Sequence, residues 1–228
     1  MGVLTDYQLQ NGYFMDIGGF PPAKIIHTVA EYDGSEQCCI SCTQLQGRYS
    51  DPECKKILRD WIHFLNDNPT AFRALHFNSH VPQALFDAIC CQENLTELRL
   101  KWGNYSRLSN LTDLKHLQYL YLGTCPGVQD LTPITQSQEL VVLYIENFKR
   151  ITDYSALQKL NRLEQLVISG PILADVPVAD IDFIRHMPNL ASVWFPNVRI
   201  VKRYSDEDRE NLRATNIQGV YNQNWWAL

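Results

Sequence analysis

The feature that most constrains this chain is the pattern LxxLxL, where L is an apolar residue and x is any residue, which recurs at nearly fixed spacing. Copies span residues 72–77, 95–100, 117–122, 140–145, 163–168 and 190–195. Their central residues are separated by 23, 22, 23, 23 and 27 positions, and a further step of 27 reaches a weaker copy at 217–222. Self-similarity at this period predicts a solenoid, in which each repeat buries its apolar side chains by stacking on its neighbours.

Within each copy, the alternation of side chains predicts a short strand. In residues 97–101, for example, Leu98 and Leu100 would point into the core while Glu97, Arg99 and Lys101 would point outward. Successive strands should run parallel, because each repeat returns the chain in the same direction. The expected fold is therefore an α/β solenoid, with a parallel sheet on its concave face, short helices and turns on its convex face, and an N-terminal β/α cap.

The repeat does not extend over the whole chain. The predicted parts are an N-terminal segment at 1–50, a capping helix at 51–70, and a solenoid at 71–228 with seven strand units and a C-terminal cap. In the first part, two β-prone runs at 25–29 and 38–43 flank an Asp-Gly-Ser turn signal, which favours a β hairpin. An alternative hypothesis is that residues 1–50 are the functional part of the protein and that the repeats act only as a scaffold.

These repeats resemble the leucine-rich-repeat family over about residues 70–225. The stretch 111–122 and the Asp-Leu-Thr-Pro-Ile turn at 130–134 are most similar to the short repeats of bacterial internalins and of a eukaryotic phosphatase-regulating relative. The resemblance implies a stand-alone bacterial protein that binds a protein partner through its concave face.

The chain departs from the family pattern in the turn that follows each strand. The family places Asn or Cys three positions after the last strand leucine, and here only Cys125 conforms. Because Asn104, Asn147 and Asn197 lie one residue away, a shifted ladder of side chains is an alternative.

The outward residues at the strand centres form a column along the predicted concave face. The column consists of His76, Arg99, Tyr121, Tyr144, Val167, Trp194 and Tyr221. With parallel strands about 4.8 Å apart, six intervals give a face roughly 29 Å long, which suits a protein interface. Tyr, Trp and Arg dominate binding hot spots, although strands also favour aromatic residues without any binding role. The residues predicted to bind the partner are Tyr119, Tyr121, Tyr144, Trp194, Tyr221, Arg99, Lys101, Glu97, Glu146 and His76.

Charge and hydropathy exclude several other partners. The chain has 20 Lys and Arg against 25 Asp and Glu, with a formal net charge of -5, so it lacks the basic footprint of a nucleic-acid-binding protein. No apolar run is long enough to span a bilayer, and no secretion signal stands at the start. We expect a cytoplasmic protein without nucleic-acid or membrane partners.

Chemical motifs are few. None of the usual nucleophile, zinc-protease, phosphate-loop or dinucleotide signatures occurs, so we expect neither an enzyme nor a cofactor. Seven cysteines without a secretion signal are expected to be buried, reduced thiols. Cys39 and Cys42 form a CxxC pair, but on a strand they would point to opposite faces, whereas Cys38 and Cys42 would share one. A metal-binding or thiol-redox role for these cysteines, with Cys90 and Cys91 as distant ligands, is the alternative to a protein-binding module of the inhibitor, immunity or adaptor type.

Overall fold

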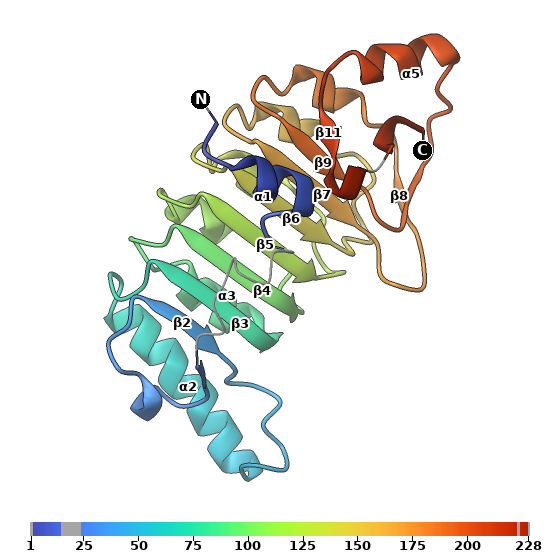
Figure 1. Ribbon diagram of the computed structural model, residues 1–228. Coiled ribbons are helices and arrows are strands. Elements are labelled where there is room, and N and C mark those ends of the chain that lie inside the picture. Colours follow the sequence, from blue (N-terminus) through green and yellow to red (C-terminus); the bar gives the residue numbers. More distant parts are fainter. Residues whose placement is uncertain (1, 15–23, 223, 228) are drawn as a thin grey trace.

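A computed structural model describes residues 2–14, 24–222 and 224–227 of the chain. These residues form a nine-stranded sheet in which every strand pairs in parallel with its neighbours, in the order of the sequence (Figure 1). The strands are β1 (Ile25–Ile26), β2 (Gln37–Ile40), β3 (Ala74–Val81), β4 (Glu97–Gly103), β5 (Tyr119–Thr124), β6 (Val142–Glu146), β7 (Gln165–Ser169), β9 (Ser192–Trp194) and β11 (Gln218–Gly219). The predicted solenoid with a parallel concave sheet is confirmed.

The register follows the repeated leucines. Leu98 pairs with Leu120, which pairs with Leu143, so that equivalent apolar side chains stack in fully buried columns. At the last copy the equivalent residues do not pair, because Val193 lies opposite Gly219 rather than Val220. Tyr221 consequently lies beyond the strand, with a left-handed φ of 55°, and the prediction that it faces outward from a strand centre is wrong.

The convex side closes each repeat with one short element. These elements are α3 (Gln83–Ile89), η2 (Ser109–Asp113), α4 (Thr132–Thr135), η3 (Ser155–Lys159) and η4 (Asp182–His186). Leu111, Ile134 and Leu157 are buried from this side. A small second sheet, β8 (Val176–Val178) paired with β10 (Val198–Ile200), lies in the longer last repeats.

Only some of the turns after the strands contain the Asn or Cys side-chain contact that the family pattern implies. The Cys125 thiol donates to the carbonyl oxygen of Tyr105 at 2.6 Å, as the family pattern implies. Asn147 and Asn197 instead adopt φ values of 57° and 54°, a left-handed conformation that Asn tolerates better than most residues. These two asparagines therefore supply the backbone conformation of the turns.

The predicted hairpin at the N-terminal end does not form. β1 and β2 run parallel, with Ile26 opposite Ile40, and β2 pairs with β3 so that Cys38 stacks on Leu75. The connection between β1 and β2 contains a turn of 3-10 helix, η1 (Val29–Glu31), and returns the chain in the same direction, as a repeat does. In this parallel arrangement Ile26 and Ile40 are both buried against the core.

Helices lie near the two ends of the sheet (Figure 1). At the N-terminal end, α2 (Asp51–Asp67) is capped by a Ser50–Glu53 capping box and buries Trp61, whose Nε1 donates to the carbonyl of His27 at 2.8 Å. At the C-terminal end, α5 (Asp206–Arg213) and η6 (Trp225–Ala227) lie together, and Trp225 is fully buried. None of the helices in the described ranges is long and apolar enough to cross a bilayer.

Candidate protein-binding face

The structure brings most of the predicted binding residues into one row. Register pairing joins His76 to Arg99, Arg99 to Tyr121, Tyr121 to Tyr144, Tyr144 to Val167 and Val167 to Trp194 across β3 to β9. In the adjacent row Glu97 pairs with Tyr119, and Lys101 and Glu146 lie toward the carboxyl ends of their strands. Tyr221 joins the row only through its ring, which contacts Trp194 edge-on at 5.3 Å.

The aromatic half of this row is not open to solvent. Tyr121 and Tyr144 are only 9% and 7% exposed, because the chain's own N-terminal segment packs over them. Leu4 and Phe14 from that segment form a second apolar cluster with these tyrosines and with Val142 and Val167 on the sheet. In Figure 1, α1 (Asp6–Asn11) lies over the sheet near β7, and it contacts β11 and η5 (Val220–Asn222) of the last repeat. Tyr121 and Tyr144 were expected as exposed anchors, and their burial corrects that expectation; Tyr119 and Trp194 are half-buried and Tyr221 is exposed.

Polar side chains of the sheet hold the backbone of this segment. The Glu164 carboxylate accepts the amides of Val3 and Leu4, at 2.6 and 2.9 Å. Gln165 donates through Nε2 to the Gln8 carbonyl at 3.0 Å, and its Oε1 accepts the amide of Tyr13 at 2.7 Å. Glu164 and Gln165 were not predicted as site residues. Both lie within the LxxLxL copy at 163–168, where the sequence pattern identified them only as residues of a strand.

Two aromatic rings complete the contact. Tyr13 stacks on Tyr119 with ring centroids 4.4 Å apart, and its hydroxyl donates to Oε2 of Glu97 at 2.9 Å. Phe14 meets Tyr121 edge-on at 5.6 Å. Burial raises the pKa of Glu97 to about 7, in spite of the Tyr13 hydrogen bond and the nearby Arg99, which both lower it.

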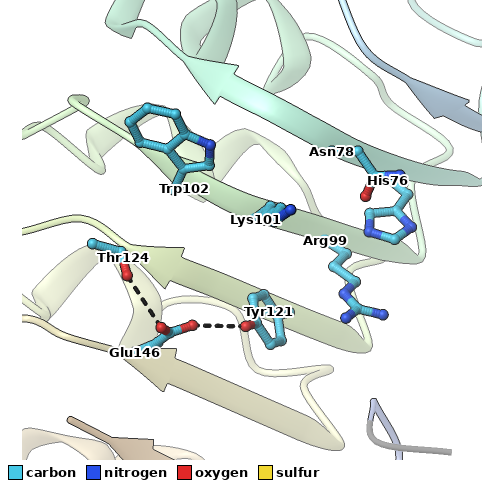
Figure 2. Close-up of a pocket in the computed structure, with 8 residues that line it drawn as sticks. All are labelled: His76, Asn78, Arg99, Lys101, Trp102, Tyr121, Thr124 and Glu146. Atoms are coloured by element: carbon cyan, nitrogen blue, oxygen red, sulfur yellow. Dashed lines mark hydrogen bonds between the residues drawn. The ribbon is translucent and has the colours of Figure 1, made fainter. Parts of the chain in front are cut away.

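The other half of the face contains an open hollow of about 610 Å³ (Figure 2). It is lined by His76, Asn78, Arg99, Lys101, Trp102, Tyr121, Thr124 and Glu146. Trp102, Asn78 and Thr124 were not among the predicted residues. Strict alternation would send Trp102 inward with Leu100, but it lies at a point where the register between β3 and β4 shifts, and it lines the hollow instead.

The hollow has an uneven charge distribution. The Glu146 carboxylate accepts the hydroxyls of Tyr121 and Thr124, at 2.8 and 3.1 Å (Figure 2). The Arg99 guanidinium lies 5.0 Å from the Tyr121 ring centroid, and none of the ion pairs in the described part of the chain includes Arg99 or Lys101. Burial, followed by the proximity of these two cations, lowers the pKa of His76 to about 4, so His76 is neutral at neutral pH. The hollow therefore offers two cations beside a carboxylate whose oxygens are engaged.

The cysteines do not gather into a site. Cys38 and Cys42 lie in the main core, where burial raises their thiol pKa values to about 11 and 12. Cys39 faces the other side of the sheet and accepts a hydrogen bond from Nδ2 of Asn78 at 3.0 Å. Within the ranges that the structure describes, no group of three or more His, Cys, Asp or Glu side chains is arranged to hold a metal ion.

Comparison with known proteins identifies the fold. The sequence matches no protein-family profile and no curated protein. An internalin (inlF) from Listeria monocytogenes has a similar structure, with a TM-score of 0.50 and 23% sequence identity over 68% of this chain and 50% of its own. A leucine-rich-repeat protein of Leptospira interrogans (LIC12759) matches with a TM-score of 0.45 and 17% identity, over 66% of this chain and 49% of its own. The chain thus spans about half the length of these two proteins. Its repeats, parallel concave sheet and short convex elements are those of the internalin-like leucine-rich-repeat fold.

Proposed function

We propose that this chain is a non-enzymatic module that binds a protein partner through its concave face and acts as an inhibitor or an adaptor. The observation that carries the proposal is the open hollow on that face, which is lined by Arg99, Lys101 and Trp102. Neither of the two cations forms an ion pair within the described residues. Arg and Trp are the residue types that contribute most to protein interfaces, because they combine large contact area with directed polar groups.

The charges of the hollow indicate which partner surface would fit. Arg99 and Lys101 are free to pair with carboxylates, whereas Glu146 already accepts two hydroxyl groups. A partner loop that presents one or two acidic side chains to the cations and an apolar side chain to Trp102 would complement this end of the face. The slight negative charge of the whole chain does not alter this local preference.

A catalytic role has less support. A strongly shifted pKa in a cleft can mark an acid or base, and Glu97 has such a shift. Burial beneath Tyr13 explains it, however, and the group that hydrogen-bonds to Glu97 is the hydroxyl of that same tyrosine. The metal or thiol-redox alternative is likewise not favoured, since the raised thiol pKa values suppress the reactive thiolate.

Affinity capture with matched variants tests the proposal. The full chain with Arg99→Ala, Lys101→Ala and Trp102→Ala should retain at least tenfold less partner than the wild type, because one hot-spot residue can contribute about 2 kcal/mol. The control carries Lys115→Ala and Lys159→Ala, which remove two exposed cations from the convex side. Equal retention of every captured protein by the concave-face variant would refute the proposed binding face.

A further inference from the structure

Residues 2–14, here called the strap, occupy the half of the concave face that carries the aromatic row. The strap begins at Gly2, passes through the single helix α1 and ends with the adjacent rings of Tyr13 and Phe14. It lies on the same face as the open hollow, and Tyr121 contacts both: its ring meets Phe14 and also lines the hollow.

The strap is bound as a separate peptide would be. It contributes no strand to the sheet, and the main core of the described residues includes none of its side chains. Its helix has six residues, none of them buried, and is stabilised internally by a capping box between Thr5 and Gln8. The solenoid is therefore complete beneath the strap, which adds a second, smaller apolar cluster on its surface.

Most hydrogen bonds between the sheet and the strap are made to the backbone of the strap. Glu164 receives two successive amides, and Gln165 both accepts from and donates to the backbone. Backbone contacts of this kind do not depend on the identity of the bound residues, so they can hold any segment of suitable shape. Selectivity must then come from the side chains of Leu4, Tyr13 and Phe14, which enter the apolar cluster.

The same contacts can be broken without leaving an uncompensated charge in the interior. Glu164 has no cation partner in the described part of the chain, and with the strap removed its carboxylate would be free to bind water. The cost of removal is the exposure of Tyr119, Tyr121 and Tyr144, whose rings then need another apolar cover. An external segment that supplies such a cover can therefore replace the strap.

We infer that the strap is an intramolecular competitor: the aromatic half of the concave face is a peptide-binding groove, the strap is its resident occupant, and a partner segment with the same chemistry displaces it. That chemistry is two successive free backbone amides for Glu164, a leucine-sized aliphatic side chain beside them, and two adjacent aromatic side chains nine residues further on, as in the spacing from Leu4 to Tyr13. The groove is inferred from the strap contacts alone, whereas its use by a partner rests on the proposed function.

A synthetic peptide of residues 2–14 provides a direct test on the full chain. In a variant with Tyr13→Ala and Phe14→Ala, the weakened strap should let the added peptide bind at least tenfold more tightly than it binds to the wild type. The control variant is Tyr7→Ala, since Tyr7 belongs to the strap but is 57% exposed, and it should bind the peptide as weakly as the wild type. A peptide with alanine at both aromatic positions should bind to none of them.

Two results would overturn the inference. One is a folded double variant, judged by its circular dichroism, that binds the peptide no better than the wild type. The other comes from amide hydrogen exchange on the wild-type protein, a measurement that tests the inference even if the double variant fails to fold. The strap amides of Val3, Leu4 and Tyr13 should exchange at least a hundredfold faster than the amides of β6, and equal protection would make the strap an inseparable part of the fold.

This test can be distinguished from the test of the proposed function. Peptide binding to the variant with Tyr13→Ala and Phe14→Ala requires no natural partner. Its result therefore does not depend on the result of the affinity capture. If a partner is captured through Arg99 and Lys101, the variant with Tyr13→Ala and Phe14→Ala should retain at least tenfold more of it than the wild type. Equal retention would show that the partner does not compete with the strap, even where the hollow binds it.

Discussion

Replacing Glu97 with glutamine should change how the stability of the protein depends on pH. Glu97 is only 8% exposed beneath Tyr13, and burial raises its pKa from the usual 4.5 to about 7. A carboxyl group with a raised pKa in the folded state favours folding most fully below its unfolded pKa. That contribution is lost as the pH rises through about 7, because folding then requires a buried carboxylate.

The magnitude follows from the shift. One pKa unit corresponds to about 1.36 kcal/mol, so the rise from 4.5 to about 7 is worth roughly 3.4 kcal/mol in all. Of this, Glu97 should lower the free energy of unfolding by roughly 2.5 kcal/mol between about pH 5 and pH 8. His76 acts in the opposite direction, since its pKa is lowered to about 4 and its contribution is lost as the pH falls below 6.5. The two groups partly cancel in the wild type, and the difference between wild type and variant isolates Glu97.

The assay is urea unfolding of wild type and Glu97→Gln at several pH values across this window. The difference in unfolding free energy between the two should move by roughly 2.5 kcal/mol in favour of the variant from low to high pH. Glu146→Gln, which removes the same charge from the same face, serves as the control. In a Tyr13→Ala background the pH-dependent difference should shrink, because water then reaches Glu97. A difference that stays constant with pH would refute the assignment of the raised pKa to burial under the strap.

Three further predictions concern the solenoid and its thiols. A Cβ at Gly123 would overlap the carbonyl oxygen of Lys101 on the neighbouring strand, so Gly123→Ala should destabilise by about 1 to 3 kcal/mol in urea unfolding, and an unchanged midpoint would contradict the close approach. Trp225→Ala should cost about 3 to 5 kcal/mol, measured in the same way, because it removes a fully buried ring that donates to the Ile217 carbonyl at 2.9 Å. The exposed thiol of Cys91 should react with a thiol reagent in the native protein, whereas the buried Cys42 should react only after unfolding; equal rates would show that the core opens readily.

The solenoid could be predicted from the sequence because its signal is repeated. Each LxxLxL copy specifies a strand, and the neighbouring copies fix its register, so Leu98, Leu120 and Leu143 stack as their spacing requires. The last copy is the weakest in sequence, and there the register moves by one residue, to Gly219. The β1–β2 pair was predicted as a hairpin because its turn signal is local, whereas its parallel pairing follows from the core it must join.

The strap could not be predicted in the same way. The Thr5–Gln8 pair indicates the start of its helix. Leu4, Tyr13 and Phe14 are apolar residues within a polar stretch, which indicates that they are buried against another part of the protein. The location of that site depends on Glu164 and Gln165, which follow the strap by about 150 positions and resemble ordinary strand residues. Local patterns do not encode such long-range contacts, so Tyr121 and Tyr144 were predicted in the correct row but wrongly as exposed side chains.

Tyr121 connects the two halves of the concave face. Its ring contacts Phe14 of the strap at 5.6 Å and Tyr144 at 4.3 Å, while the Arg99 guanidinium lies over it at 5.0 Å and its hydroxyl donates to Glu146 at the wall of the hollow. A partner carboxylate that draws Arg99 toward it weakens the cation–π contact, which is worth about 0.5 to 2 kcal/mol. Because Tyr121 both lines the open hollow and contacts Phe14, a partner that fills both halves of the face would contact the same ring from two sides.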